Sequence, residues 1–335
     1  MIIMKFGGTS VGSAERIAAT TDLVKASSKP AVVVLSAMSG ITNKLLEVAD
    51  GKRDIAEIAE LHKRAAAELS LDESLNVRID EILASASTHD EIVACGELLS
   101  STLVQAYMRR QGIDAVWVSA LDFMKIDRKG DPDTEFICEH VAATLDNAGR
   151  HDVYVTQGFI CRDSDKLIST LTRGGSDYTA TLLGEALCAD EVQIWTDVDG
   201  VYTADPRYVK GAHCIPEMSF AQADRAARCG AKILHPECIL PAQRARIPVR
   251  VLDSFHPERY GTKIGDIADA EGFIAVAYDG KHVNLIGHDC NVTTDDIAGA
   301  AVSDDIKTHE DYISLSAGSE NAYEIMQTLH DKYVK

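Results

Sequence analysis

Short apolar runs alternate with longer helical patterns along most of this chain, and that alternation narrows the folds it can adopt. Buried-strand candidates occur at residues 2–4, 30–36, 116–118, 153–156, 192–196 and 248–252. Helical candidates lie between them at residues 54–69, 74–86, 91–110 and 176–189, with Asp90 as the expected N-cap of the third. Strands that alternate with helices favour a mostly parallel sheet covered on both faces. The sequence therefore predicts an α/β fold whose ligands bind at the carboxyl ends of the strands.

The composition changes near residues 261–263, where a second and smaller unit is expected to begin. Its strand candidates are residues 274–277, 283–286 and 312–315, and its helix candidate is residues 320–333. The last of these has the apolar spacing of an amphipathic helix. We therefore expect a large α/β domain over residues 1–265 and a small α+β unit over residues 270–335.

The charge balance excludes one large class of partner. The chain has 335 residues and a formal net charge of −19, with 33 basic against 52 acidic side chains. An acidic chain repels the phosphate backbone, so nucleic acid is not expected as a partner. An anionic small substrate would need local clusters of cationic side chains. No apolar run reaches the roughly 18–20 residues that span a membrane, so no membrane partner is expected.

The cysteines indicate a reducing compartment. Eight of them are scattered along the chain without a C-x-x-C pair. This pattern fits reduced thiols better than a disulfide framework or a zinc site. The first residues enter a strand candidate directly and do not resemble a signal peptide. We therefore expect a cytoplasmic protein.

A glycine turn follows the first strand candidate and precedes a helical stretch. Residues 5–10 read Lys-Phe-Gly-Gly-Thr-Ser. A turn of this kind points backbone N–H groups outward at a helix N-terminus, which favours a bound anion. Gly7 and Gly8 would let a phosphate approach the backbone, and Lys5 would add a full positive charge. The alternative is an ordinary strand–helix turn with a solvated lysine. The segment is not a P-loop.

Two further segments carry polar residues after apolar ones. Residues 36–43, Ser-Ala-Met-Ser-Gly-Ile-Thr-Asn, follow a buried strand candidate, and Ser36 and Thr42 could line an anion or amino-acid site or belong to a helix cap. Glu97 stands between Gly96 and an apolar helix face. It could meet a substrate ammonium, although a glutamate at such a position is more often solvated.

A second glycine turn precedes an alanine-rich helix candidate. Residues 173–177 read Arg-Gly-Gly-Ser-Asp. Gly174 and Gly175 free the backbone, and Ser176 or Asp177 is expected to cap the helix. Arg173 can hold a carboxylate with two parallel hydrogen bonds.

The segment 195–207 is dense in polar and turn-forming residues after a strand candidate. It could bind a nucleotide base, ribose or phosphate. Lys232 follows in the segment 230–236, Gly-Ala-Lys-Ile-Leu-His-Pro. A lone lysine there is usually solvated, but with Lys5 and the glycine turns it becomes a candidate for phosphate contact.

Taken in chain order, these segments resemble those of aspartate kinases, within the amino-acid-kinase family. The resemblance covers residues 1–265 and rests on residues 5–10, 36–43, 96–98, 173–177, 196–198, 202, 205–207 and 230–236. Other kinases of this fold, for acetylglutamate, glutamate, carbamate or UMP, share the sheet and the glycine turns but do not resemble the full set. Another acid kinase of the same fold and a non-catalytic amino-acid-binding regulator remain as alternatives.

The resemblance implies transfer of a phosphoryl group from ATP, with Mg²⁺, to the side-chain carboxylate of L-aspartate, the first step towards lysine, threonine and methionine. It implies catalytic roles for Lys5, Arg173, Asp177 and Lys232. For aspartate it implies Ser36, Thr42, Glu97, Arg173, Gly174, Gly175 and Ser176. For ATP it implies Lys5, Gly7, Gly8, Ser10, Thr196, Asp197, Tyr202, Arg207 and Lys232. No metal ligand is assigned, and Asp177 could serve Mg²⁺ or the helix cap.

The sequence departs from the family pattern in two places. Thr172 stands where a glycine is common, and its role is open. The family usually carries two regulatory ACT units, whereas residues 270–335 resemble one abbreviated unit, with a short acidic segment over residues 287–307. We expect weak or absent inhibition by lysine or threonine and a homodimer paired through this unit.

Replacing Arg173 by lysine should mainly weaken aspartate binding. A point charge cannot reproduce the two-pronged grip of a guanidinium on a carboxylate. The Michaelis constant for aspartate should rise strongly while that for ATP stays nearly constant in steady-state kinetics. A rise in the ATP constant instead would place Arg173 in the nucleotide site.

Overall fold

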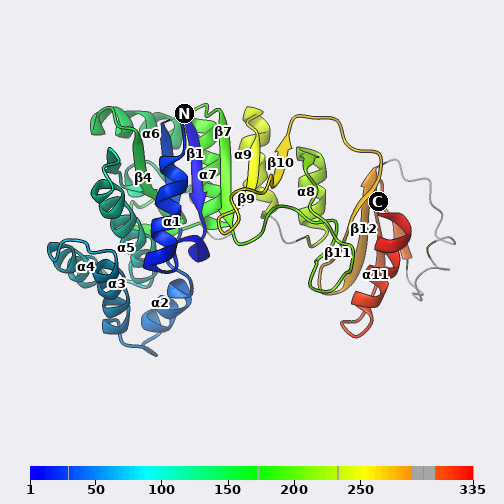
Figure 1. The fold of residues 1–335 in the computed structure, drawn as a ribbon, viewed down its shortest axis with the longest axis horizontal. Coiled ribbons are helices and arrows are strands. Elements are labelled where there is room, and N and C mark those ends of the chain that lie inside the picture. The colour runs from blue at the N-terminus through cyan, green and yellow to red at the C-terminus, as the bar shows by residue number, and fades with distance from the viewer. Residues whose placement is uncertain (29, 172–173, 232–233, 289–296, 298–305, 335) are drawn as a thin grey trace. The chain divides into compact units, whose positions relative to one another are not determined.

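The computed structural model describes residues 1–28, 30–171, 174–231, 234–288, 297 and 306–334. The chain divides into two compact units (Figure 1). The first comprises Met1–Val198 and Leu252–Arg259, and the second comprises Asp199–Val251 and Tyr260–Lys335.

A parallel sheet forms the centre of the first unit. Its strands are β1 Ile2–Phe6, β2 Ala31–Leu35, β3 Ala115–Trp117, β4 Val153–Gln157 and β7 Glu191–Thr196. β1 pairs in parallel with β2 and with β7, and Lys5 stands opposite Val34 and Ile194. β4 pairs in parallel with β2 and β3. Since all these strands run the same way, their carboxyl ends meet at one edge of the sheet.

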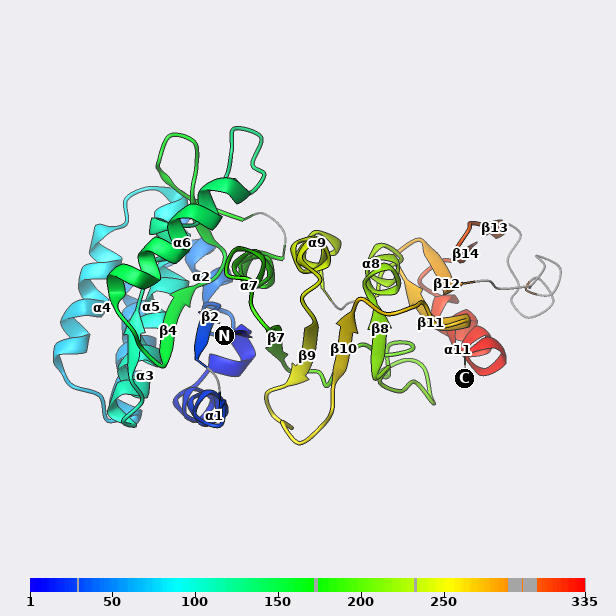
Figure 2. The same ribbon diagram turned by 90° about the horizontal axis from the view of Figure 1, so that it is seen from above.

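Helices cover both faces of this sheet. They are α1 Ala14–Lys25, α2 Ile41–Ala49, α3 Ala56–Glu68, α4 Ser74–Ser85, α5 His89–Arg110, α6 Thr134–Ala148 and α7 Gly175–Ala186. Alternate strand residues face opposite sides, so Met4 and Val33 share a buried core with α1–α5. Gly184 of α7 lies against Val192, on the other face. Figure 2 shows α6 and α7 on one side of the strands and α1 on the other.

Small elements complete the first unit. Two 3₁₀ helices span Gly8–Val11 and Ala120–Asp122. A short antiparallel hairpin joins β5 Ile160–Arg162 to β6 Ile168–Thr170. The first 3₁₀ helix continues directly from the predicted glycine turn, so this turn does lie between a strand and a helix.

The second unit contains a four-stranded antiparallel sheet. Its strands, in spatial order, are β11 Gly272–Tyr278, β12 His282–His288, β14 Tyr312–Ser316 and β13 Ile306–Thr308. Helix α11 Ala322–Tyr333 packs on one face of it through Ile325, Met326 and Leu329. The unit also holds α8 Phe220–Arg228, α9 Pro236–Ala245, β8 Glu217–Ser219 and β10 Thr262–Gly265.

Eight described strands form one sheet in the order β3-β4-β2-β1-β7-β9-β10-β8, where β9 is Val249–Asp253. β9 and β10 pair antiparallel, whereas β10 and β8 pair in parallel. The predicted fold class is therefore confirmed: a mostly parallel sheet with helices on both faces, together with a small α+β element. The domain boundary between residues 265 and 270 stays a prediction.

Two predicted helix caps are wrong. Helix α5 begins after Thr88, whose hydroxyl accepts from the Glu91 N–H while the Glu91 carboxylate accepts from the Thr88 N–H, so Asp90 lies in the first turn. This reciprocal pair satisfies two backbone donors at once and outcompetes a single aspartate. Helix α7 begins after Gly174, which adopts φ +63°, and neither Ser176 nor Asp177 is its cap. Only glycine takes that left-handed backbone without strain.

The helices and the cysteines each bear on what the sequence predicts about membranes and disulfides. No helix in the described part of the chain is long and apolar enough to cross a bilayer. The seven described cysteines, at positions 95, 138, 161, 188, 214, 229 and 238, are all free thiols. Cys290 lies outside the described residues.

His62 is a fully buried histidine on α3, within the core of the first unit. Its Nδ1 donates to the carbonyl of Ile58 at 2.8 Å, and its Nε2 has no hydrogen-bond partner. Burial lowers the pKa of His62 below its usual value of 6.5. The ring is therefore neutral in the folded protein near neutral pH.

This burial should make stability fall in mild acid. The unfolded chain binds a proton on His62 below about pH 6.5, whereas the folded chain does so only at lower pH, so the free energy of unfolding decreases as pH falls through that window. We expect His62→Leu to lose less stability between pH 7 and pH 5.5 than the unsubstituted protein. Urea unfolding at several pH values measures the difference, and parallel curves for the two proteins would contradict the prediction.

Candidate active site

Lys5 forms a buried ion pair at the carboxyl end of β1. Its Nζ lies 2.6 Å from Oδ1 of Asp177, in the first turn of α7. Lys5 is only 8% exposed. Its neighbour Gly7 has no side chain, and a Cβ there would stand 3.5 Å from Nζ. The ammonium is thus held by the Asp177 carboxylate, and a side chain at position 7 would stand in van der Waals contact with it.

The glycine turn interlocks with the loop that follows β2. A Cβ on Gly8 would meet the carbonyl oxygen of Ala37 at 2.7 Å, so a larger residue cannot stand there without a shift of the backbone. The N–H of Ser39 donates to the carbonyl of Gly8 at 3.0 Å. The two predicted segments, 5–10 and 36–43, are therefore neighbours at one edge of the sheet.

The hydroxyl groups of Ser36 and Ser176 meet beside this turn. Ser36 Oγ donates to Ser176 Oγ at 2.9 Å, and Ser100 Oγ of α5 donates to the carbonyl of Ser36 at 2.7 Å. Gly158 makes room for Ser176, since a Cβ there would come within 2.4 Å of the Ser176 Cβ. Thr42 lies half-buried in the first turn of α2.

Glu97 is a buried carboxylate with one unused oxygen. It is 3% exposed, and its Oε1 accepts from the Ala37 N–H at 3.1 Å. Its Oε2 is buried and has no hydrogen-bond partner. Burial raises the pKa of Glu97 to about 8. A solvated glutamate is therefore excluded, and a cation beside Oε2 would stabilise the ionised form.

The second glycine turn ends at α7 and is shaped by Phe159. A Cβ on Gly175 would meet the Phe159 ring at 2.6 Å. Phe159 itself adopts φ +67°, which is rare for a bulky residue and marks a tightly determined loop. Thr172 and Arg173 lie outside the described residues.

Ser254 joins the glycine turn to the end of β7, and the sequence analysis missed it. Its Oγ lies 2.8 Å from Ser10 Oγ, and its N–H and Oγ both reach the carbonyl of Thr196, at 2.9 and 3.0 Å. Arg16 Nη2 donates to the Ser254 carbonyl at 2.7 Å, and its guanidinium lies 3.6 Å from the centroid of the Phe255 ring. The position of Ser254 directly after the β9 strand was the available signal.

Three predicted nucleotide residues, Ser10, Thr196 and Asp197, lie beside this junction. Ser10 is fully buried, and its hydroxyl is used by Ser254 and by the carbonyl of Trp195. Thr196 Oγ1 donates to Asp197 Oδ1 at 3.1 Å. Any contact of these residues with ATP stays a prediction.

The remaining predicted nucleotide residues belong to the second unit. Tyr202 donates its hydroxyl hydrogen to Asp199 Oδ1 at 2.5 Å. Arg207 is exposed and pairs with Asp205 through Nε, at 2.9 Å, and Nη2, at 2.5 Å. Lys232 lies outside the described residues.

A metal ion has little to bind among the described side chains. None of them form a group of three or more histidine, cysteine, aspartate or glutamate residues suited to a metal. The Lys5 ammonium already engages Oδ1 of Asp177, the one carboxylate that the sequence offered as a metal ligand.

The parallel sheet, with a lysine, two glycine turns and a buried acid at its strand ends, defines an α/β protein suited to small charged ligands. The amino acid kinase family matches residues 1–253, and the chain belongs to that family. The resemblance drawn from the motifs is thus confirmed.

Curated relatives are aspartokinases. The lysine-sensitive aspartokinase 3 of Escherichia coli K12 is 38% identical over 286 residues, which are 79% of this chain and 64% of that protein. The chloroplastic aspartokinase 1 of Arabidopsis thaliana is 36% identical over 297 residues, which are 80% of this chain and 52% of that protein. The chain thus spans between half and two thirds of the length of these relatives.

Solved structures agree with the sequence relatives. E. coli aspartokinase III in complex with lysine and aspartate superposes with a TM-score of 0.82 at 28% identity, covering all of both chains. The same enzyme in complex with aspartate and ADP gives a TM-score of 0.73 at 32% identity, covering 99% of this chain and 83% of that one.

Proposed function

We propose that this protein is an aspartate kinase, which converts ATP and L-aspartate to ADP and 4-phospho-L-aspartate. The observation that carries the proposal is the buried Glu97, with its unused Oε2, in the same strand-end region as the Lys5–Asp177 pair. One group suits a substrate ammonium and the other a phosphate. The aspartokinase relatives support the same substrate.

The chemistry needs little from the protein besides position and charge. The aspartate side chain is ionised near pH 7, so no general base is required. One of its carboxylate oxygens forms a bond to the γ-phosphorus, and the bond from that phosphorus to the bridging oxygen breaks, leaving its electron pair on ADP. Catalysis then consists of holding two anions in line and neutralising the transferring group.

Lys5 would supply a positive charge beside the transferring phosphoryl group. Asp177 holds its ammonium at 2.6 Å and is a positioning residue in this scheme. The Gly7 N–H already donates to the Trp195 carbonyl at 3.0 Å, so Gly7 would serve by leaving room for a phosphate. The backbone N–H of Gly8 and those of the Gly174–Gly175 turn would add donors without reorganisation. Lys232 is proposed as a second cation, and Mg²⁺ is proposed to accompany ATP and neutralise its phosphates.

The aspartate molecule has three charged groups to be matched. Glu97 is proposed for its ammonium, and Arg173 and Ser176 for its carboxylates. Ser36 and Thr42 would line the same pocket, since Ser36 already touches Ser176. Ser10, Thr196, Asp197, Tyr202 and Arg207 are kept as proposed ATP contacts.

Assembly and location are part of the proposal. β13 is the last described strand in the order of the four-stranded sheet, and the edge strand of a sheet favours cover by another chain. We propose a homodimer on that ground. The cytoplasmic location stays a prediction, and some relatives are named chloroplastic.

The direct test is an ADP-forming assay with L-aspartate, glutamate, acetylglutamate, carbamate and UMP as acceptors. We expect turnover with L-aspartate, and Lys5→Ala should lower it by about 10²–10³, as for the loss of one charge-stabilising donor. Lys25→Ala, at the exposed end of α1, is the matched control and should keep full activity. Preference for another acceptor would favour a different acid kinase, and unchanged turnover in Lys5→Ala at saturating ATP would remove Lys5 from the mechanism.

Aspartate binding should release a proton from Glu97. At pH 7 the free carboxyl group is mostly protonated, because its pKa is about 8. An ammonium beside Oε2 lowers that pKa, so close to one proton should leave per aspartate bound, and the release should fade above pH 8. Calorimetry in buffers of different ionisation enthalpy measures it.

Glu97→Gln should abolish this release and weaken aspartate binding tenfold or more, by analogy with a lost charged hydrogen bond of roughly 1.5–3 kcal/mol. Glu139→Gln, an exposed acid on α6, serves as the control. Binding without proton release in the unsubstituted protein would show that Glu97 does not face the ammonium.

A further inference from the structure

The segment that carries Tyr202 and Arg207 is built into the core of the antiparallel sheet. Ala204 and Val209 are buried in the same hydrophobic cluster as Val276, Leu285 and Leu329. The N–H of Val276 also donates to the carbonyl of Thr203 at 2.7 Å. Within the second unit, therefore, the sheet and α11 determine the path of residues 203–209.

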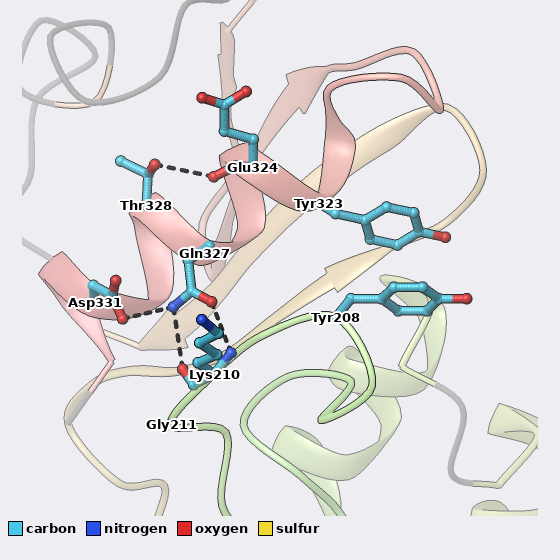
Figure 3. Close-up of a pocket in the computed structure, with 8 residues that line it drawn as sticks. All are labelled: Tyr208, Lys210, Gly211, Tyr323, Glu324, Gln327, Thr328 and Asp331. Atoms are coloured by element: carbon cyan, nitrogen blue, oxygen red, sulfur yellow. Dashed lines mark hydrogen bonds between the residues drawn. The ribbon is translucent and has the colours of Figure 1, made fainter.

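Helix α11 holds the same segment through polar contacts. Gln327 accepts from the Lys210 N–H at 2.7 Å and donates to the Lys210 carbonyl at 3.1 Å (Figure 3). His330 Nε2 lies 2.9 Å from Thr203 Oγ1 in a buried contact. The rings of Tyr208 and Tyr323 are stacked, with centroids 3.9 Å apart. These contacts, here called the clamp, join α11 to both ends of the segment, at Thr203 and at Lys210.

Strand β12 holds a second segment, the turn after α8. Asn284 is 2% exposed, and its Nδ2 donates to the carbonyl of Cys229 at 2.9 Å. Ser314 Oγ of β14 donates to Asn284 Oδ1 at 2.8 Å and fixes the orientation of the amide. Val283 and Leu285 belong to the core under α11, so Asn284 faces the opposite side of the sheet.

The turn itself fits closely against the sheet. Gly230 adopts φ +97°, and a Cβ there would come within 2.8 Å of the Asp279 Cα, in the loop between β11 and β12. Neither the backbone angle nor the space admits a side chain. Lys232 follows two residues later in the sequence.

We propose that Gln327 and Asn284 are positioning residues for nucleotide binding. Through them the C-terminal helix and sheet hold residues 203–210, which include Arg207, and the turn at residues 229–230, which precedes Lys232 in the sequence. The proposal rests on the proposed function. A segment held in its binding conformation loses less freedom when the ligand binds, so these contacts would tighten ATP binding without touching the reacting atoms. The four-stranded sheet and α11 would then support the nucleotide site, and removing them would weaken nucleotide binding.

Asn284→Ala tests the first contact. We expect a three- to tenfold rise in the Michaelis constant for ATP, little change in that for aspartate and a turnover number within twofold. Leu285→Ala is the matched control, because it weakens the same strand on the opposite face and leaves the Cys229 contact intact. An equal rise in Leu285→Ala at similar loss of thermal stability would show that the effect is structural only.

Gln327→Ala tests the second contact on the surface of α11, where misfolding is a smaller risk. Thr328→Ala is its control, because the Thr328 hydroxyl only donates to Glu324 within the helix. Direct titration with ADP should show weaker binding for Gln327→Ala and unchanged binding for Thr328→Ala. Unchanged ADP affinity in both Gln327→Ala and Asn284→Ala would overturn the inference alone, whereas an unsubstituted protein that binds no adenine nucleotide would overturn the proposed function as well.

Discussion

Parallel pairing of β1 with β2 on one side and β7 on the other is the constraint on which the first unit depends. A strand paired on both sides and covered on both faces is largely apolar, so polar groups gather near the end where it leaves the sheet. Lys5 stands one residue before that point, and the shared register brings Ser36 and Thr196 to the same edge. The helix that begins there, α7, supplies the opposite charge through Asp177.

Small residues allow these charged groups to gather. A Cβ on Gly96 would stand 2.7 Å from the Ala37 Cβ, so α5 approaches the loop after β2 closely enough for Glu97 to bond the Ala37 N–H. The same closeness excludes water from Glu97 and raises its pKa to about 8. Packing and electrostatics are therefore one effect here: the contact that orients the carboxylate also makes its ionised form costly until a cation arrives.

Sequence patterns predicted what depends on neighbouring residues. The pattern of short apolar runs located most strands of both units. The turn at residues 5–10 lies, as predicted, between the first strand and a helix. The predictions that failed concern helix caps, where neighbouring residues compete for one position, and a residue whose partners are distant in the sequence. Thr88 became the cap of α5 because it pairs reciprocally with Glu91, and Gly174 became the cap of α7 because that position has a left-handed backbone. Ser254 became important only through its distance to Ser10, 244 residues away in the chain, and no local pattern carries that information.

The clamp on residues 203–210 has a consequence for how the protein is made. Lys210 and Gln327 are 117 residues apart, and Thr203 and His330 are 127 apart. Contacts of such separation form late, because a long loop must close before they contribute. On a ribosome, residues 203–210 would leave the exit tunnel well before α11 is synthesised. The first unit can therefore form most of its sheet before α11, the last helix of the second unit, has been synthesised.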